Sequence, residues 1–378
     1  MANVDILIIG GGPAGSTLAW AMRDSGLRLA VMDKSTFPRD KICAGWVTPE
    51  VMQELKLDLD DYQQQNILQP VKGFRISQLG GREVDTGYDT GPISYSIRRC
   101  EFDHYLLQRC GAELILDSKF KSMVRDGDHW LVNGEHKAKL IVGAGGHFCP
   151  VARAIGAKPT NGETVVAAQE IEFKMSETQK LECSAQGDMP ELFFCEDLTG
   201  YGWVVRKGDY LNVGLGREDN HKLAEHVKAF VQFLKQQHKI PQDTPEKFHG
   251  HAYLLYPHAV REVVQDNVLL IGDAAGLAYP QSGEGIRPAV ESALMAAQTI
   301  REANGDYSVR QLEDYQQQLT ERFGKRQPSP DFMERLPLGI KQFFARHLLS
   351  NHWFAQKVVM DRWFLHRQQA PLHCEEAL

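Results

Sequence analysis

The sequence predicts an α/β fold: a domain built on a parallel sheet, an inserted domain built on an antiparallel sheet, and a C-terminal helical region. Three observations predict it. Two buried-strand patterns, at residues 4–9 and 267–271, each run into a glycine-rich turn and then a helical pattern. Between them, residues 70–98 and 160–255 are rich in short alternating segments joined by turns. Beyond residue 300 the pattern is helical.

These patterns divide the chain. We expect the first domain to comprise residues 1–70, 99–155 and 256–300, the inserted domain residues 71–98 and 156–255, and the helical region residues 301–378. The 378 residues are 43% hydrophobic and 24% charged, which is typical of a globular protein. The net charge of −7 predicts no nucleic-acid partner, because the chain has no basic surplus to neutralise phosphates.

Some expectations come from what the sequence lacks. No stretch approaches ~20 uninterrupted apolar residues, and the first residues have no basic segment of the kind that opens a signal peptide. The seven cysteines include no C-x-x-C pair and no zinc-type spacing. We therefore expect a cytoplasmic protein without disulfides or a structural metal.

The first glycine-rich turn has the spacing of a Rossmann-like dinucleotide site, with Gly10, Gly12 and Gly15 after the strand of residues 4–9. The first glycine allows a tight turn, the second lets a pyrophosphate approach the backbone, and the third lets helix and strand pack closely. Pro13 and Ala14 belong to the same turn. The next strand ends at Asp33, where an acid binds a ribose hydroxyl, and Lys34 follows it. The alternative is a glycine-rich loop in an unrelated α/β protein.

The second glycine-rich segment decides which dinucleotide is expected. The strand of residues 267–271 runs into Gly272 and Asp273, and a turn at Gly283, Gly285 and Ile286 precedes a long helix. The sequence here resembles the flavoprotein superfamily that includes para-hydroxybenzoate hydroxylase, flavin-dependent halogenases and geranylgeranyl reductases. The resemblance implies FAD, with Asp273 on its ribityl chain and the amides of residues 283–286 at the flavin ring. The alternative for Asp273 is a helix N-cap after a strand.

Two further segments bear on this resemblance. Residues 97–103 resemble the R-x-x-F-D stretch of the superfamily, which assigns the FAD-contacting arginine to Arg99, or to Arg98 if the match is shifted by one residue. Either arginine could instead be a solvated charge. Many relatives also carry an Asp-Gly motif that helps hold FAD and NADPH, whereas Gly145 stands here in place of the acid. The electron donor therefore stays open between NAD(P)H and a ferredoxin.

A hairpin in the inserted domain is expected to line the cavity over the flavin. Alternation along residues 200–207 places Tyr201, Trp203 and Val205 on one face. Tyr201 and Trp203 match the Y-x-W-x-F-P stretch of the geranylgeranyl reductase branch, although Val205 and Arg206 replace its Phe-Pro. The related halogenase motif would need a further tryptophan and a proline. The alternative for Trp203 is packing in the core.

The segment Lys41-Ile-Cys-Ala-Gly-Trp46 resembles the K-x-C-G-G loop of the reductase branch, which passes close to the flavin ring. Cys43, Ala44 and Gly45 are therefore expected at the cofactor, with Ala44 in place of one glycine. Cys43 is a candidate to protonate a carbon that receives hydride, and Tyr201 and Trp203 are candidates to line the reaction site. The alternative for Cys43 is an inert buried thiol.

The C-terminal region combines aromatic pairs such as Phe343-Phe344 and Trp353-Phe354 with scattered basic residues. Such a segment could lie on a membrane surface, or it could pack on the protein's own core.

Taken together, the resemblance implies an FAD-dependent oxidoreductase that reduces carbon–carbon double bonds of a prenyl-like or other hydrophobic substrate, with electrons from an external donor. The first alternative is an FAD-dependent monooxygenase or halogenase acting on an aromatic or polyketide-like substrate. The second is a flavoprotein without turnover, because fold does not fix function.

Overall fold

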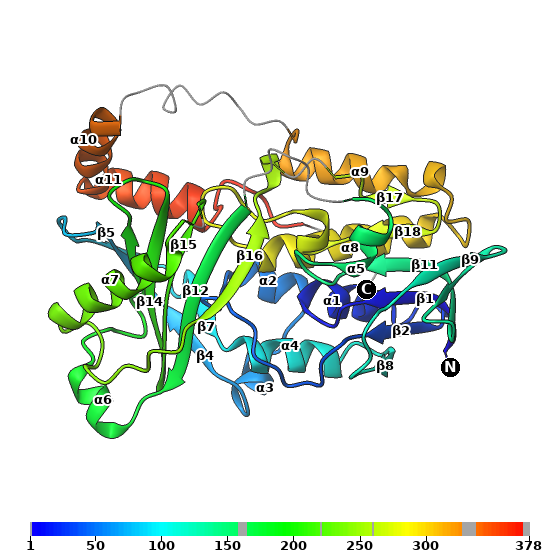
Figure 1. The fold of residues 1–378 in the computed structure, drawn as a ribbon, viewed down its shortest axis with the longest axis horizontal. Helices are drawn as coiled ribbons and strands as arrows, with labels where there is room; N and C mark the ends of the chain where they lie inside the picture. Colours follow the sequence, from blue (N-terminus) through cyan, green and yellow to red (C-terminus); the bar gives the residue numbers. More distant parts are fainter. Residues whose placement is uncertain (1, 158–164, 220, 259–260, 327–337, 373–378) are drawn as a thin grey trace.

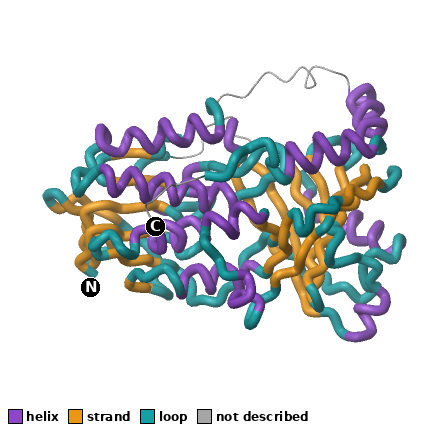
Figure 2. Tube along the Cα trace, turned by 180° about the vertical axis from the view of Figure 1, so that it is seen from behind, coloured by secondary structure: helices purple, strands orange, loops and turns teal. Residues whose placement is uncertain are grey.

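The computed structural model describes residues 2–157, 165–219, 221–258, 261–326 and 338–372. The molecule is elongated, with a parallel sheet at the end that carries the N-terminus and a second large sheet toward the other end (Figure 1). Seen from behind, the strands again form two groups, with long helices over the first group (Figure 2). The predicted α/β class is confirmed.

The first sheet has eight strands, of which five form a parallel core in the order β18-β11-β1-β2-β8. The register places Ile9 of β1 opposite Met32 of β2 and Gly143 of β11, and Gly143 opposite Leu270 of β18. The loops after these four strands therefore leave the sheet at one edge, where ligands bind in such folds. The eight strands are β1 (Asn3–Ile9), β2 (Leu29–Met32), β8 (Glu113–Ile115), β9 (Met123–Asp126), β10 (His129–Val132), β11 (His136–Gly143), β17 (Val264–Gln265) and β18 (Val268–Leu270).

Four longer helices accompany this sheet, and α1 and α8 are the most deeply buried of them. Ala289, Ala293 and Ala296 are all buried on α8, and small side chains of this kind allow the close approach of α8 to α1. The helices are α1 (Pro13–Met22), α4 (Arg99–Gln108), α8 (Ile286–Glu302) and α9 (Val309–Phe323), with the short α5 (Pro150–Ala154) and the 3₁₀ turns η1 (Tyr256–His258) and η2 (Gly272–Ala275).

The second large sheet has seven strands in the order β16-β12-β15-β14-β13-β5-β6. The sequence predicted an antiparallel sheet, and all neighbouring pairs are antiparallel except β5 with β13, which is parallel. The strands are β5 (Gly73–Gln78), β6 (Val84–Gly87), β12 (Val165–Lys174), β13 (Glu191–Phe194), β14 (Gly200–Lys207), β15 (Tyr210–Arg217) and β16 (His249–Leu254); α6 (Glu177–Glu182) and α7 (Leu223–Gln236) accompany them.

The two faces of this sheet carry different residues, as the alternation along β14 predicted. Val204 lies in the apolar cluster that α7 covers. Trp203 and Val205 lie in the cluster on the opposite face, and Tyr201 packs against that cluster. A separate three-stranded sheet, β3-β7-β4, was not anticipated from the sequence; its elements are β3 (Trp46–Val47), β4 (Leu68–Val71) and β7 (Ser94–Ile97), with α2 (Pro49–Glu54) and α3 (Leu59–Gln63) nearby in the chain.

The C-terminal aromatic stripe has two environments rather than one. Val359, Phe364 and Leu365 are buried in the cluster that holds Trp203, so this part packs on the second sheet. Phe343 and Trp353, each 66% exposed, face solvent. The elements are α10 (Leu338–Leu349), α11 (His352–Phe354) and the π-helical η4 (Ala355–Phe364). No helix within the described ranges is both long and apolar enough to cross a bilayer.

Candidate active site

The first glycine turn is shaped by contacts that exclude larger side chains. A Cβ on Gly10 would lie 2.4 Å from the Ala144 carbonyl oxygen, and a Cβ on Gly15 would lie 1.9 Å from that of Gly10. Gly12 is the N-cap of α1 and Pro13 its first helical residue, and no side chain caps the helix. The first N–H groups of α1 are therefore left to a ligand, as a pyrophosphate site requires.

Asp33 follows β2 at the same sheet edge, as predicted. Its carboxylate accepts the Gly11 N–H at 2.8 Å and the Ser35 N–H at 2.9 Å, so it is fixed beside the glycine turn. Lys34, the next residue, is exposed. The geometry thus supports a ribose contact by Asp33 and offers no comparable support for Lys34.

The second glycine segment meets the first in space, although more than two hundred residues separate them in the chain. A Cβ on Gly272, which has φ +60°, would lie 3.0 Å from the Cβ of Ala14. Asp273 follows, and its Oδ1 would be 2.9 Å from a Cβ on Gly285, the N-cap of α8. Asp273 therefore lies against the turn that ends at Ile286, and a side chain at position 285 would displace the Asp273 carboxylate.

The side chains of Arg99 and its neighbour Arg98 contact different residues. Arg99 is buried and makes a bidentate ion pair with Asp103, with N···O distances of 2.8 and 2.9 Å, and its guanidinium also lies beside the Cys43 thiol. Arg98 pairs with Glu101 and Glu172. The structure brings Arg99, and not Arg98, to the loop expected at the flavin.

The Cys43 loop lies between the two large sheets and contacts both domains. Gly45 has φ +67°, and a Cβ there would lie 2.3 Å from the Ile97 carbonyl oxygen and 2.6 Å from Lys207 Nζ. Cys43 is half-buried, and its peptide N–H donates to Glu170 Oε1 at 2.5 Å. Ala44 packs against the apolar cluster of the second sheet. The loop is thus held closely from the inserted domain.

The two predicted aromatic residues lie on the face of the second sheet that is turned to this loop. The Trp203 indole covers Gly214, where a Cβ would lie 2.2 Å from the ring, and its Nε1–H donates to Asn212 at 2.8 Å. The Tyr201 hydroxyl donates to the Ser282 carbonyl, which ties the sheet to the turn before α8, and its ring contacts Phe364. Trp203 is therefore buried against the second sheet, and Tyr201 connects that sheet to the turn before α8 by a hydrogen bond.

Three charged or polar residues at this place were not predicted as site residues: Lys41, His251 and Tyr253. Lys41 Nζ lies 2.9 Å from His251 Nε2. Burial, and after it the charge of Arg99, lowers the pKa of Lys41 to about 8. Burial, and after it the charge of Lys41, lowers the pKa of His251 to about 3. Spacing along β16 at 249, 251 and 253 could have shown that these side chains share a face.

The residues present fit an FAD. In the glycine turns at residues 10–15 and 272–285, a Cβ would occupy space beside the backbone that a cofactor could use. The N-terminus of α1 has no side-chain cap, and Asp273 lies by the turn before α8. Tyr253 lies against the same turn, since its Oη would be 2.2 Å from a Cβ on Gly283. Burial, and after it the neighbouring Cys43 thiol, raises the pKa of Tyr253. No group of three or more His, Cys, Asp or Glu residues in the described ranges is arranged to hold a metal.

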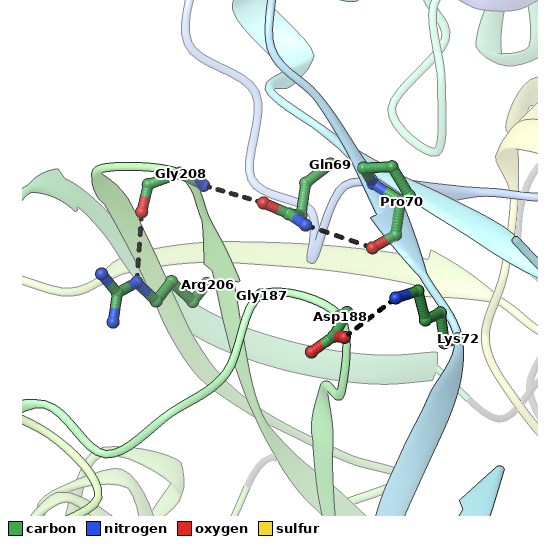
Figure 3. A pocket seen from close by; sticks show the side chains of 7 residues that line it. All are labelled: Gln69, Pro70, Lys72, Gly187, Asp188, Arg206 and Gly208. Carbon is green, nitrogen blue, oxygen red and sulfur yellow. Dashed lines mark hydrogen bonds and ion pairs between the residues drawn. The ribbon is translucent and has the colours of Figure 1, made fainter.

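An open cavity of about 420 Å³ lies elsewhere, between β4 and the turn that joins β14 to β15 (Figure 3). Its lining includes the Gln69 amide, which accepts the Gly208 N–H at 3.4 Å, and the Lys72–Asp188 ion pair. None of the predicted site residues lines it, so it is distinct from the candidate active site.

Comparison with known proteins agrees with this geometry. A family model described as "FAD binding domain" matches residues 3–327. The chain belongs to this family. The digeranylgeranylglycerophospholipid reductase of Methanocaldococcus jannaschii is 27% identical over 334 residues, covering 84% of this chain and 82% of that protein. The menaquinone reductase of Mycobacterium tuberculosis is 29% identical over 321 residues, covering 79% and 76%.

A solved structure of a geranylgeranyl bacteriochlorophyll reductase-like protein from Thermoplasma acidophilum superposes with a TM-score of 0.74. It is 22% identical and covers all of this chain and 95% of that one, so it establishes the fold. The chain is an FAD-dependent oxidoreductase, as the motifs predicted, and it is similar to these reductases over most of its length.

Proposed function

We propose that this flavoprotein saturates carbon–carbon double bonds in the polyprenyl part of a lipid. One observation carries the proposal: the Cys43 thiol, the Tyr201 ring and the turn before α8 meet between the two sheets, beside the place that fits the flavin. Both relatives described above are named as reductases of molecules with polyprenyl chains, and this chain matches each over most of its length.

In this proposal, different residues bind FAD, supply the proton and line the substrate cavity. Gly10, Gly12 and Asp33 would hold the adenosine half of FAD, and Asp273 with the amides at 283–286 would hold the flavin half. Bound and reduced, FAD supplies a hydride. Cys43 would hold the proton for the neighbouring carbon at Sγ, and the Tyr201 and Trp203 rings would form an apolar wall that excludes water.

The electron donor in this proposal is external, either NAD(P)H or a ferredoxin. At the end of β11 the chain has Gly145, and a Cβ there would already lie 3.1 Å from Pro150. A carboxylate at this position would need the neighbouring backbone to shift, so the acid with which many relatives contact NADPH has no counterpart here. This favours a protein donor.

A membrane surface is the proposed source of the substrate. The exposed apolar side chains of α10 and α11 form a set that we name the α10–α11 patch: Ile340, Phe343, Phe344, Leu348 and Trp353. Arg346 lies within it, and Lys357 and Arg362 follow on η4. Apolar and basic side chains together suit a surface of anionic lipids.

The test is a turnover assay in which dithionite supplies the electrons, so that the natural donor is not needed. The purified holoenzyme is incubated anaerobically with digeranylgeranyl phospholipid or with menaquinone, and products are examined by mass spectrometry. Mass gains of 2 per reduced double bond support the proposal if they persist after air has reoxidised the quinol that dithionite forms from menaquinone. The two substrates distinguish the lipid classes. If both stay unchanged, and admission of air produces a transient flavin–oxygen adduct, the enzyme is an oxygenase.

A further inference from the structure

A network of polar side chains lies beneath the Cys43 loop, on the face of the second sheet that is turned to the active site. Glu170 and Glu172 project from β12, Lys207 from β14 and Asn212 from β15. Lys207 Nζ is fully buried and donates to Glu172 Oε2 at 2.6 Å. None of these four residues is predicted by the motifs that identify the flavin site.

Two residues of the network make hydrogen bonds to the backbone N–H and the backbone carbonyl of Cys43. Glu170 Oε1 accepts the Cys43 N–H at 2.5 Å, and the Asn212 amide donates to the Cys43 carbonyl at 3.3 Å. Asn212 is itself fixed by the Trp203 indole N–H at 2.8 Å. On the other side of the loop, the thiol lies beside Arg99. The backbone of Cys43 is thus held by the inserted domain while its thiol faces the flavin domain.

We propose that Glu170 is the positioning residue for Cys43, and that the charge of its carboxyl group controls how firmly the Cys43 loop is held. This inference rests on the proposed function, in which Cys43 lies at the reaction site. A hydrogen bond from an N–H to an ionised carboxylate is roughly twice as strong as one to a neutral acceptor. The loop is therefore held more firmly when Glu170 is ionised.

Glu170 can change its charge in the physiological range. Only 4% of its surface is exposed, and Oε2 makes no hydrogen bond within the described part of the chain. Burial raises the pKa of Glu170 to about 7, against the opposing effects of the Cys43 N–H and Lys207. The other titratable groups around it are Glu172 on its own strand, His249 opposite it on β16 and Cys43 itself.

The test measures alkylation of Cys43 by iodoacetamide in the FAD-loaded protein, followed by peptide mass spectrometry from about pH 5.5 to 9. Above pH 7 an ionised Glu170 holds the loop and adds negative charge near the thiol, and both effects slow alkylation. Glu170→Gln keeps an acceptor for the N–H and removes the charge. We expect this variant to react about fivefold faster than wild type at pH 8.5 and equally fast at pH 6.

Glu170→Ala removes the acceptor as well, so its Cys43 is expected to react faster than in the glutamine variant at every pH. Cys100, which is half-buried on α4, is the internal control and keeps its rate in all variants. Glu177→Gln, an exposed change on α6, is the matched control. Identical pH profiles in wild type and both Glu170 variants, with FAD content retained, would overturn the inference.

This readout separates two failures. If the Glu170 variants change Cys43 alkylation as expected but Cys43→Ala retains full turnover, Glu170 positions a loop that the reaction does not use, and the proposed role of Cys43 is wrong. If Cys43→Ala abolishes turnover while the Glu170 variants leave alkylation unchanged, the proposed function stands and the inference about Glu170 fails.

Discussion

The structure supports the predicted cofactor contacts of some residues better than those of others. A Cβ on Gly10 or Gly15 would lie within 2.4 Å of a backbone oxygen, and one on Gly272 or Gly285 would push against the side chain of Ala14 or Asp273, whereas Lys34 is simply exposed. Arg99 is committed to Asp103 by two hydrogen bonds, which hold its guanidinium at the Cys43 loop. The glycines of the first turn could be predicted from their spacing, whereas the cofactor role of Gly272 and Gly285 was expected only from the family resemblance.

Asp273 offers the sharpest test of the cofactor site. We expect Asp273→Ala to weaken FAD binding at least about tenfold, which corresponds to ~1.4 kcal/mol, because a charged hydrogen-bond acceptor is lost at the flavin. FAD titration followed by fluorescence quenching measures this change. Asp128→Ala, an exposed change in the turn between β9 and β10, is the control. Unchanged affinity in the Asp273 variant would remove this residue from the site.

Residues that approach the site from a distant strand could not be predicted. Glu170, His251 and Tyr253 reach it only because β12 and β16 pair in one particular register, with Glu170 opposite His249 and Ala168 opposite His251. A register shift of one residue would turn them to the other face of the sheet. Single-sequence patterns show alternation along a strand but carry no information on which strand lies beside it.

Among the elements, the edge of the parallel sheet does most to assemble the cofactor site. Four strands end together, so their loops meet whatever their distance in the chain. The strand–turn–helix order of both glycine segments made this part predictable. The parallel pairing of β5 with β13 was not, because it joins segments that more than one hundred residues separate. The predicted residue limits of the domains remain a prediction.

Helix α2 contains a buried acid that links stability to pH. Glu54 accepts the Leu372 N–H at 2.8 Å, and burial, with a smaller effect of Glu291, raises the pKa of Glu54 to about 7. The folded protein therefore holds a proton that the unfolded chain releases above about pH 4.5. The contribution of Glu54 to the free energy of unfolding is full below that pH and falls as the pH rises through 7.

Glu54→Gln removes this dependence. We expect the variant to be more stable than wild type at pH 8, by on the order of 2 kcal/mol, and to lose this advantage at pH 5. Thermal unfolding of the holoprotein at both pH values measures the difference. The exposed Glu177→Gln serves as the control, and an equal change at pH 5 and pH 8 would show that the effect is not ionisation.

At the scale of the whole molecule, the α10–α11 patch lies at the end remote from the parallel sheet (Figure 1). If it contacts lipid, replacing Phe343 and Trp353 together by Glu should reduce binding to phosphatidylglycerol vesicles at least about fivefold, because charge replaces apolar area. Vesicle co-sedimentation measures this. Leu181→Glu, at a leucine on α6 that is 89% exposed and lies outside the patch, is the control. Equal binding by all three proteins would exclude the patch as a membrane contact.

The contact between Tyr201 and Phe364 can form only late in synthesis, because Phe364 lies near the C-terminal end of the described residues. Tyr201 lines the proposed reaction site, and Phe364 completes the apolar cluster behind it. The glycine turn at residues 10–15 leaves the ribosome first, and domains near the N-terminus fold first. The strands of the parallel sheet and both glycine turns therefore leave the ribosome before Phe364 can complete the cluster behind Tyr201. A ribosome that stalls before Phe364 would leave a chain with its glycine turns in place and its substrate side open.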